Sequence, residues 1–265
     1  MLVFPQLNTG ASATYPFTRV NVKRTIVNQL TDGRTDVFSD AGGASLLWVL
    51  PARGLTRSEL DAIEALFIQT RGRLATFTFL DPVSNLLSYS ETFTQTNWTQ
   101  DPLVQLIAGI TDPAGTATGT ALINTAPTVS GITQSVTIPH RFHYCLSAWM
   151  RSSAAASARL SIIAGTASIT KSFNVTSQWT QQYISGAPAV TNGSGIQVSI
   201  KTVPGSTIEL YGVQLEPQLA PSNYKMTTSQ GGVYSKARFA ADELTSTAQE
   251  SDVFDAVIRI VTTGS

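Results

Sequence analysis

The chain has 265 residues, a formal net charge of zero and 13% charged residues, about half the usual charged share of a soluble domain. Its length fits one large domain or two ordinary ones, and 42% hydrophobic residues suffice for a core. The balanced charge and the absence of a long basic run argue against nucleic-acid binding. The single cysteine, Cys145, excludes an intramolecular disulfide. No apolar run reaches the about 20 residues of a membrane span, and residues 1–6 do not resemble a signal peptide, so we expect a soluble protein made in a cytoplasm.

Strand patterns and one tight turn dominate the first 82 residues. Strands are predicted over residues 18–27 and 34–39, joined by the turn at residues 31–34, because Asp32-Gly33 readily adopts the positive φ of a hairpin turn. A third strand is predicted over residues 44–50 and is expected to end at Pro51. A further strand over residues 74–80 places Phe77 and Phe79 on one face.

A helix is predicted over residues 56–71. Thr56 and Glu59 have the spacing of a capping box, in which each side chain bonds the other residue's backbone N–H. The apolar residues of the segment fall on one helical face: Leu60, Ile63, Leu66 and Phe67. Arg71-Gly72 supplies a cationic last turn and a glycine stop.

The composition changes after Asp81-Pro82, where a stretch rich in Ser, Thr, Gly and Ala begins. Short β-rich runs fill it without a helical period: residues 104–110, 119–123, 131–138, 143–152, 158–164, 169–175, 179–186, 195–203 and 207–216. Residues 253–261 alternate strongly and are expected to complete the first domain's sheet. The predicted fold is therefore mainly β: a split β-rich domain with one helix (1–82 and 230–265) and an inserted β-sandwich of jelly-roll type (83–229). The ends of the insert, near Pro82 and Gly231-Gly232, must then lie close together.

The outer segments contain Phe4-Pro5, the Thr-Asp-Gly-Arg turn at 31–34, and Thr-Arg-Ser-Glu-Leu at 56–60. They continue with Phe-Thr-Phe-Leu-Asp-Pro at 77–82 and Ala-Arg-Phe-Ala-Ala-Asp-Glu-Leu at 237–244. In this order they resemble the belt domain of phage distal tail or minor tail-tip proteins. The resemblance implies a ring, usually a hexamer, between the tail tube and the tip or baseplate.

The inserted segment carries a second set of motifs, at residues 85–93, 97–98, 146–152, 178–179, 208–216 and 222–224. Together they resemble the jelly-roll modules of phage structural proteins, which are similar to carbohydrate-binding modules. The resemblance is specific for the fold and weak for the identity of a ligand. The family's Ser-Tyr-Ile-Pro-Thr ending is replaced here by Ser-Asn-Tyr-Lys-Met-Thr at 222–227.

Aromatic side chains of the insert are candidates for a sugar platform, since aromatic rings stack on the C–H faces of pyranose rings. The candidates are Trp98, Trp179, Tyr89 and Tyr183. The alternative is that the tryptophans are sandwich core. For Trp149, beside Leu146 and Met150 in an alternating strand, core packing is the preferred interpretation.

The carboxylates of the insert do not predict catalysis. Glycoside hydrolysis needs two carboxyl groups about 5–9 Å apart across a cleft, and nothing in the sequence pairs Glu91, Glu209 or Glu216 in that way. We expect Glu216 to bond backbone groups, and a structural Ca²⁺ ion is the alternative. His140, His143 and Cys145 lack a fourth metal ligand, so a buried cysteine is expected and no metal site is predicted.

Charged residues on the helix of the first domain suggest an interface between subunits. Glu59, Asp61 and Glu64 line its outer face, and Arg71 and Arg73 flank its end. An acidic face of one subunit could meet a basic face of the next in a closed ring. The alternative is a solvated helix.

These expectations combine into a virion structural protein of the tail tip or baseplate, without enzymatic activity or cofactor. It is made in the host cytoplasm and resides in the virion tail. The belt forms a ring, a hexamer by resemblance, that contacts the tail tube and tail hub proteins. The inserted module points outward and binds host-surface polysaccharide. A glycan-degrading tail enzyme and a purely architectural insert without a ligand are the alternatives.

Overall fold

The computed structural model describes residues 1–190 and 192–263, without the side chains of residues 41 and 263. It confirms a mainly β fold with a single helix among the described residues. The chain separates into two compact units. Unit 1 comprises residues 1–8, 13–79 and 234–265, and unit 2 comprises residues 9–12 and 80–233. No helix in the described part of the chain is long and apolar enough to cross a membrane.

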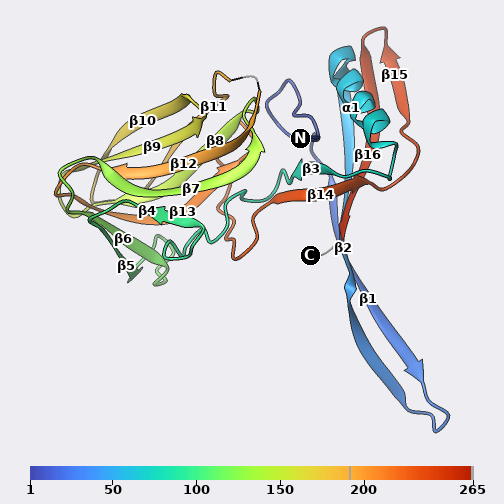
Figure 1. The fold of residues 1–265 in the computed structure, drawn as a ribbon, viewed down its shortest axis with the longest axis horizontal. Coiled ribbons are helices and arrows are strands. Elements are labelled where there is room, and N and C mark those ends of the chain that lie inside the picture. The colour runs from blue at the N-terminus through green and yellow to red at the C-terminus, as the bar shows by residue number, and fades with distance from the viewer. Residues whose placement is uncertain (191, 264–265) are drawn as a thin grey trace. The chain divides into compact units, whose positions relative to one another are not determined.

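Unit 1 is built on a 6-stranded sheet whose order is β1 (Thr18–Gln29), β2 (Thr35–Thr56), β16 (Val253–Thr263), β14 (Val233–Phe239) and β3 (Phe77–Leu80), with β15 (Ser246–Glu250) paired to β16 (Figure 1). The predicted C-terminal strand does return to this sheet, where it pairs with β2 and β14. The first and last parts of the chain therefore form one sheet.

The prediction of two separate strands, over residues 34–39 and 44–50 with an end at Pro51, was wrong, because both belong to β2. It is one strand of 22 residues, with a register shift where Ser45 and Asp40 face β1. Beyond Val49 it no longer pairs with β1, and Pro51 pairs only with Val257 of β16. Proline is tolerated where a strand has one free side, because no second neighbour needs its N–H.

The helix α1 (Arg57–Thr70) has the predicted capping box. Thr56 Oγ1 accepts from the Glu59 N–H at 3.4 Å, and the Thr56 N–H donates to the Glu59 carboxylate at 2.8 Å. Arg71 ends the helix in the left-handed conformation at φ 52°. Leu60, Ile63 and Leu66 are buried, which confirms the predicted apolar face.

The core of unit 1 is rich in aromatic rings. Trp48 is fully buried, with its ring centroid 5.0 Å from that of Phe79 and 4.8 Å from that of Tyr234. Phe77 stands 5.0 Å from Phe239. Strands from both ends of the chain thus supply one aromatic cluster.

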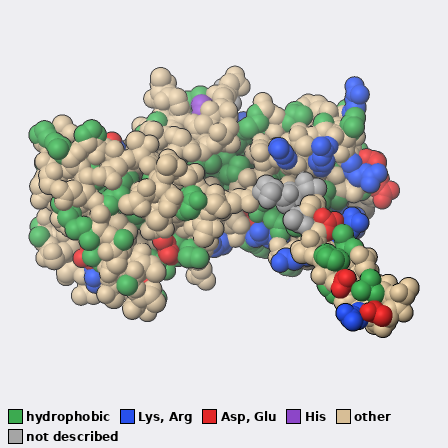
Figure 2. Space-filling view, turned by 60° about the horizontal axis from the view of Figure 1, so that its bottom comes forward, with side chains coloured by type: hydrophobic (Ala, Val, Ile, Leu, Met, Phe, Trp, Pro, Cys, Tyr) green, Lys and Arg blue, Asp and Glu red, His purple; other side chains and the backbone are tan. Residues whose placement is uncertain are grey.

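Outside this core, β1 and the first part of β2 form a hairpin that is exposed along its length (Figure 1). The predicted turn is present, with the Leu30 N–H bonded to the Arg34 carbonyl at 2.8 Å and Gly33 at φ 82°. Apolar residues such as Val37 and Phe38 are 63% and 52% exposed. Figure 2 shows charged side chains gathered over unit 1 and this hairpin, whereas the visible face of unit 2 carries few.

Unit 2 is a sandwich of two 5-stranded antiparallel sheets. The first, called the β12 sheet, has the order β10 (Ala167–Val175), β9 (Ala156–Ala164), β12 (Ser194–Thr202), β7 (Ser130–Pro139) and β4 (Trp98–Gln100). The second, called the β8 sheet, has the order β11 (Thr180–Gly186), β8 (Tyr144–Arg151), β13 (Thr207–Glu216), β6 (Gly119–Asn124) and β5 (Val104–Ile110). Each predicted run of the insert corresponds to one of these strands, and only the short β4 was not predicted.

The core of the sandwich is aliphatic. Its fully buried residues include Leu160, Ile162, Val198 and Ile200 of the β12 sheet and Leu122, Leu146, Met150 and Leu210 of the β8 sheet. Two-residue periodicity places these side chains on the facing surfaces of the two sheets. The opposite surfaces are therefore free to carry polar and aromatic residues.

The two ends of the insert meet, as predicted. The Asp81 N–H donates to the Gly232 carbonyl at 2.9 Å, and the Gly232 N–H donates to the Asn85 carbonyl at 2.7 Å. Asn85 is fully buried, and its side chain bonds the backbone of Val213 and Leu215 in β13. The entry and exit of unit 2 are thus fastened to its own sheet.

Candidate functional site

The outward surface of the β8 sheet carries the most distinctive side chains of unit 2. In β8, Leu146, Ala148 and Met150 are fully buried and face the sandwich core. Their alternate neighbours Trp149 and Arg151 must face away from it, because successive side chains of a strand point to opposite sides. This surface is called the outer face below.

A row of side chains crosses three strands on the outer face. Trp149 of β8 is paired with Gln181 of β11 and with Tyr211 of β13. The side chains of residues paired across antiparallel strands share a face, and their Cβ atoms are about 4.5–5.5 Å apart. Tyr183 lies two residues after Gln181 in β11, where it pairs with Ser147, and it is 47% exposed. The outer face therefore presents three aromatic rings from three adjacent strands, with an amide among them.

An ion pair borders this row. Arg151 is paired in register with Glu209, and its Nε donates to the Glu209 carboxylate. The guanidinium also lies 4.8 Å from the ring centroid of Trp179, a cation–π contact that holds this ring beside β8. The Trp179 Nε1 is buried without a hydrogen-bond partner among the described residues.

Residues 217–225 bring polar contacts to the other end of the outer face. Ser185 Oγ donates to the Leu219 carbonyl at 2.6 Å. Glu216 is fully buried, and its carboxylate accepts from the Ser222 N–H at 3.0 Å and from Lys225 Nζ at 2.8 Å. The expected backbone bond of Glu216 is confirmed. The residues do not fit a Ca²⁺ ion, because Lys225 supplies the compensating charge and no group of three metal-ligating side chains occurs among the described residues.

The four predicted sugar-stacking residues do not form one platform. Trp98 is 5% exposed, packs edge-on against Phe93 at 5.1 Å and donates Nε1–H to the Tyr89 carbonyl at 2.9 Å. Tyr89 is partly buried in the same segment, at φ 49°. Trp179 and Tyr183 belong to the outer face instead. The structure thus separates the predicted residues into an interior pair and a surface pair.

Trp149 was expected in the core and lies partly exposed on the outer face. The prediction grouped it with Leu146 and Met150, yet an odd-numbered position cannot share their face in a regular strand. The same parity puts Tyr211 opposite to Ile208 and Leu210. Sequence reasoning missed Trp149, Tyr211, Gln181 and the Arg151–Glu209 pair, and strict two-residue counting from the apolar positions would have found them.

The two histidines and the cysteine serve structural roles. Cys145 is fully buried, as expected, and burial together with the nearby Glu216 charge raises the pKa of its thiol to about 12. His140 bonds the carbonyl groups of Asn192 and Gly195, both at 3.1 Å. His143 bonds Ser185 Oγ at 2.9 Å, and burial lowers the pKa of its imidazole. Cys145 is therefore not an activated nucleophile, because a thiol with a raised pKa stays protonated at neutral pH.

Three of the five charged residues predicted at a subunit interface, on and after α1, have partners within unit 1. Arg73 pairs with Asp242 at 2.8 Å, and Asp61 pairs with Arg57 at 3.0 Å, one turn away on the helix. Glu59 is taken up by the capping box and by the Asn8 N–H at 2.7 Å. Arg71 is exposed and Glu64 partly buried. The exposed pairs fit a solvated helix as well as an interface, so the subunit contact stays a prediction.

Comparison with known proteins gives similarity of shape only. No family model matches the chain, and no curated protein matches its sequence. Among solved structures, the enzymatically active domain of bacteriophage CBA120 tailspike protein 4 is 18% identical, with a TM-score of 0.39, over 52% of this chain and 22% of its own. The CBM22-1 xylan-binding domain of Paenibacillus barcinonensis Xyn10C is 15% identical, with a TM-score of 0.40, over 55% of this chain and 98% of its own.

A third similar structure is TmCBM61 in complex with β-1,4-galactotriose, at 16% identity and a TM-score of 0.37, over 49% of this chain and 97% of its own. The structural neighbours thus include a phage tailspike domain and several carbohydrate-binding modules. Scores at this level do not establish the function of this chain, which has to be argued from its own outer face.

Proposed function

We propose that unit 2 is a carbohydrate-binding module that binds a glycan on the outer face of the β8 sheet. The observation that supports this most directly is the row formed by Gln181, Trp149 and Tyr211 across three strands, with Tyr183 next to it. Aromatic rings bind the apolar faces of sugars, and the Gln181 amide at one end of the row can bond hydroxyl groups.

The proposal is one of binding without catalysis. The two carboxylates of the outer face, Glu209 and Glu216, are in ion pairs with Arg151 and Lys225. Neither is free to act as an acid or a nucleophile on a bound sugar while its partner is present. A module of this kind retains its ligand and leaves it intact.

We further propose that unit 1 anchors this module in a ring at the tip or baseplate of a virion tail, joined to tail tube and hub proteins. This part rests on the resemblance of residues 1–82 and 230–265 to belt domains. Several copies in a ring would bind a repetitive host-surface polysaccharide with avidity, so a millimolar affinity per site would suffice. The insert is then a receptor-binding module and more than a spacer.

Glycan-array binding tests the site. The native protein is expected to bind a defined set of polysaccharides, and Trp149→Ala and Tyr211→Ala are each expected to weaken binding at least about 10-fold, the loss of roughly 1.4 kcal/mol. Val257→Ala, an exposed change in unit 1, is the matched control and should bind like the native protein. Equal binding by all four proteins would exclude the outer face as the site.

Electron microscopy tests the ring. Negatively stained particles of the purified protein, and tails labelled with an antibody to it, should show a closed ring of copies at one end of the tail. A monomer in both samples would contradict the ring.

A further inference from the structure

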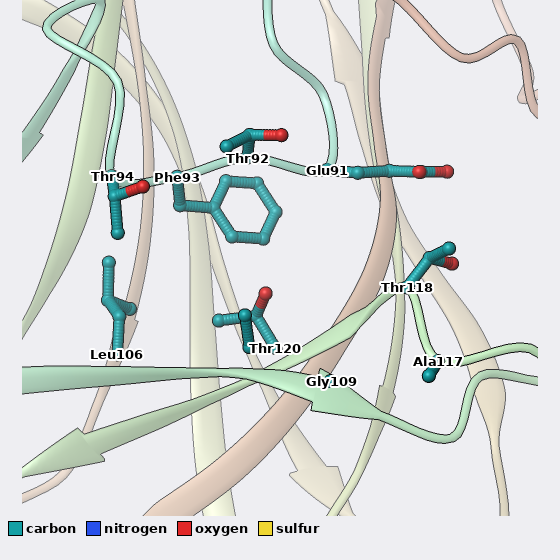
Figure 3. Close-up of a pocket in the computed structure, with 10 residues that line it drawn as sticks. Glu91, Thr92, Phe93, Thr94, Leu106, Gly109, Ala117, Thr118 and Thr120 are labelled. Atoms are coloured by element: carbon teal, nitrogen blue, oxygen red, sulfur yellow. The ribbon is translucent and has the colours of Figure 1, made fainter.

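Unit 2 has a pocket between the β5–β6 hairpin and residues 91–94. Its volume is about 230 Å³. Its walls come from Glu91 and Phe93 on one side and from Leu106, Ala117, Thr118 and Thr120 on the other (Figure 3). This volume lies below the about 300–1,000 Å³ of pockets for drug-sized ligands, so the pocket suits a small ligand such as one sugar ring.

The hairpin wall of the pocket is shaped by a β-bulge and a fixed turn. The pairing of β5 and β6 shifts between Ala108 and Ile110, where Gly109 takes φ 86° and has open space in place of a side chain. Asp112 holds the turn after β5, since its carboxylate accepts from the Ala114 N–H at 2.7 Å and from the Thr118 hydroxyl at 2.6 Å. The pocket is therefore present before any ligand arrives.

The opposite wall carries the one carboxylate of the pocket. Burial raises the pKa of Glu91, an effect that repulsion from Asp112 reinforces and a hydrogen bond from Tyr224 opposes. The Tyr224 ring stands edge-on to Tyr211, 5.2 Å between centroids, so the pocket adjoins the end of the aromatic row. In Figure 3 the Glu91 carboxylate and the Thr118 hydroxyl extend to the same side of the Phe93 ring.

The chemistry of the lining selects the ligand class. Threonine hydroxyls and the Glu91 carboxylate can bond sugar hydroxyls, while Phe93, Leu106 and Ala108 offer an apolar surface. Among the described residues that line the pocket there is no lysine or arginine to receive an acidic sugar. A carboxylate facing an anionic ligand would be repelled, and this repulsion grows with burial.

We propose that this pocket binds a single neutral sugar residue, at a second site distinct from the aromatic row. The choice of a sugar as the ligand depends on the proposed glycan-binding function, whereas the location of the site is inferred from the pocket alone. Two adjoining sites would let unit 2 hold a terminal residue and an internal stretch of glycan separately. The gain would be selectivity for neutral ends over acidic ones.

Saturation-transfer-difference NMR on the full chain tests the pocket, with the methyl glycosides of galactose, glucose and glucuronic acid at up to about 50 mM, since single sugar sites are often millimolar. A neutral glycoside is expected to bind at least about 10-fold more tightly than the glucuronide, which the Glu91 carboxylate repels. Ala117→Trp, which fills the exposed rim of the pocket, should weaken that binding at least about 10-fold. Ala114→Trp, in the same turn but outside the lining, should leave it unchanged.

Three results would contradict the pocket. The first is an equal signal from Ala117→Trp and Ala114→Trp, and the second is no signal from any neutral glycoside. The third is tighter binding of the glucuronide than of the neutral glycosides. If Trp149→Ala removes the signal while Ala117→Trp does not, the sugar binds on the outer face, so the pocket is excluded and the proposed function survives. Loss of array binding in Trp149→Ala with an intact pocket signal would support two sites.

Discussion

The centres of the two cores differ in their use of aromatic residues. Unit 1 buries Trp48, Phe77 and Phe79 in its core, under strands that come from both ends of the chain. Unit 2 fills the space between its sheets with aliphatic side chains and presents Trp149 and Tyr211 on the outer face. Buried rings contribute to stability, whereas rings on an open sheet surface contribute little to it and are available to a ligand. The position of the rings therefore fits the roles proposed for the two units, assembly for unit 1 and glycan binding for unit 2.

The largest effect should come from the core of unit 1. Trp48→Ala is expected to lower the free energy of unfolding by about 3–5 kcal/mol, because a fully buried ring leaves a large cavity. Denaturant titration followed by circular dichroism measures it. A loss below about 1 kcal/mol would show that the aromatic cluster does not hold unit 1 together.

Substitution of Trp98 and of Trp149 in unit 2 should change stability by different amounts, because the first ring is buried and the second lies on the outer face. Trp98→Ala is expected to cost about 3 kcal/mol, since the ring is buried against Phe93 and its N–H is bonded. Trp149→Ala should cost less than about 1 kcal/mol and should weaken glycan binding instead. Parallel unfolding and glycan-array measurements compare them. Equal stability losses in Trp98→Ala and Trp149→Ala would contradict the assignment of one ring to the interior and the other to the surface.

A smaller, pH-dependent effect is expected at the β5–β6 turn. Burial raises the pKa of Asp112, but hydrogen bonds from Thr116, Thr118 and the backbone outweigh it and lower this pKa to about 2. A lowered native pKa means that the contribution to stability is present above the unfolded value of 3.8 and is lost as the pH falls toward 2. We therefore expect the free energy of unfolding to decrease as the pH falls over this range.

Unfolding at pH 6 and at successive steps below pH 4 measures this loss for the native protein and for Asp112→Asn. The variant should lack that component of the pH dependence. A pH profile unchanged by the substitution would contradict the role of the turn.

The smallest effect should come from the helix cap of unit 1. Thr56→Ala removes the acceptor of the Glu59 N–H and is expected to cost about 1 kcal/mol. Thr56→Ser keeps the hydroxyl and serves as the matched control. Thermal unfolding should rank the native protein and Thr56→Ser together, above Thr56→Ala, and a reversed order would exclude the capping box as a stabilising contact.

Local signals in the sequence predicted much of the fold. The capping box of Thr56 and Glu59, the turn at Gly33 and the strand runs of unit 2 depend on neighbouring residues, so the sequence reveals them directly. Neighbouring residues do not reveal that β2 is one continuous strand. Pro51 looks like a strand end until β16, from the far end of the chain, is known to be its neighbour.

The candidate site was harder to predict for a related reason. Tyr183 and Trp179 were recognised as aromatic residues near strands, but the row of Gln181, Trp149 and Tyr211 depends on the register of three strands. Register is set by pairing between segments far apart in the sequence. The pocket beside Glu91 depends further on the β-bulge at Gly109, which no composition pattern predicts.

The meeting of Asp81 and Gly232 also has an evolutionary consequence. Because the two backbone ends of unit 2 lie at hydrogen-bond distance, any compact domain with adjacent termini can replace residues 81–232 without lengthening the path between β3 and β14. The surrounding sheet would keep its pairing during such an exchange. A lineage can thus acquire a different inserted domain by recombination in a single step, while unit 1 stays under separate selection.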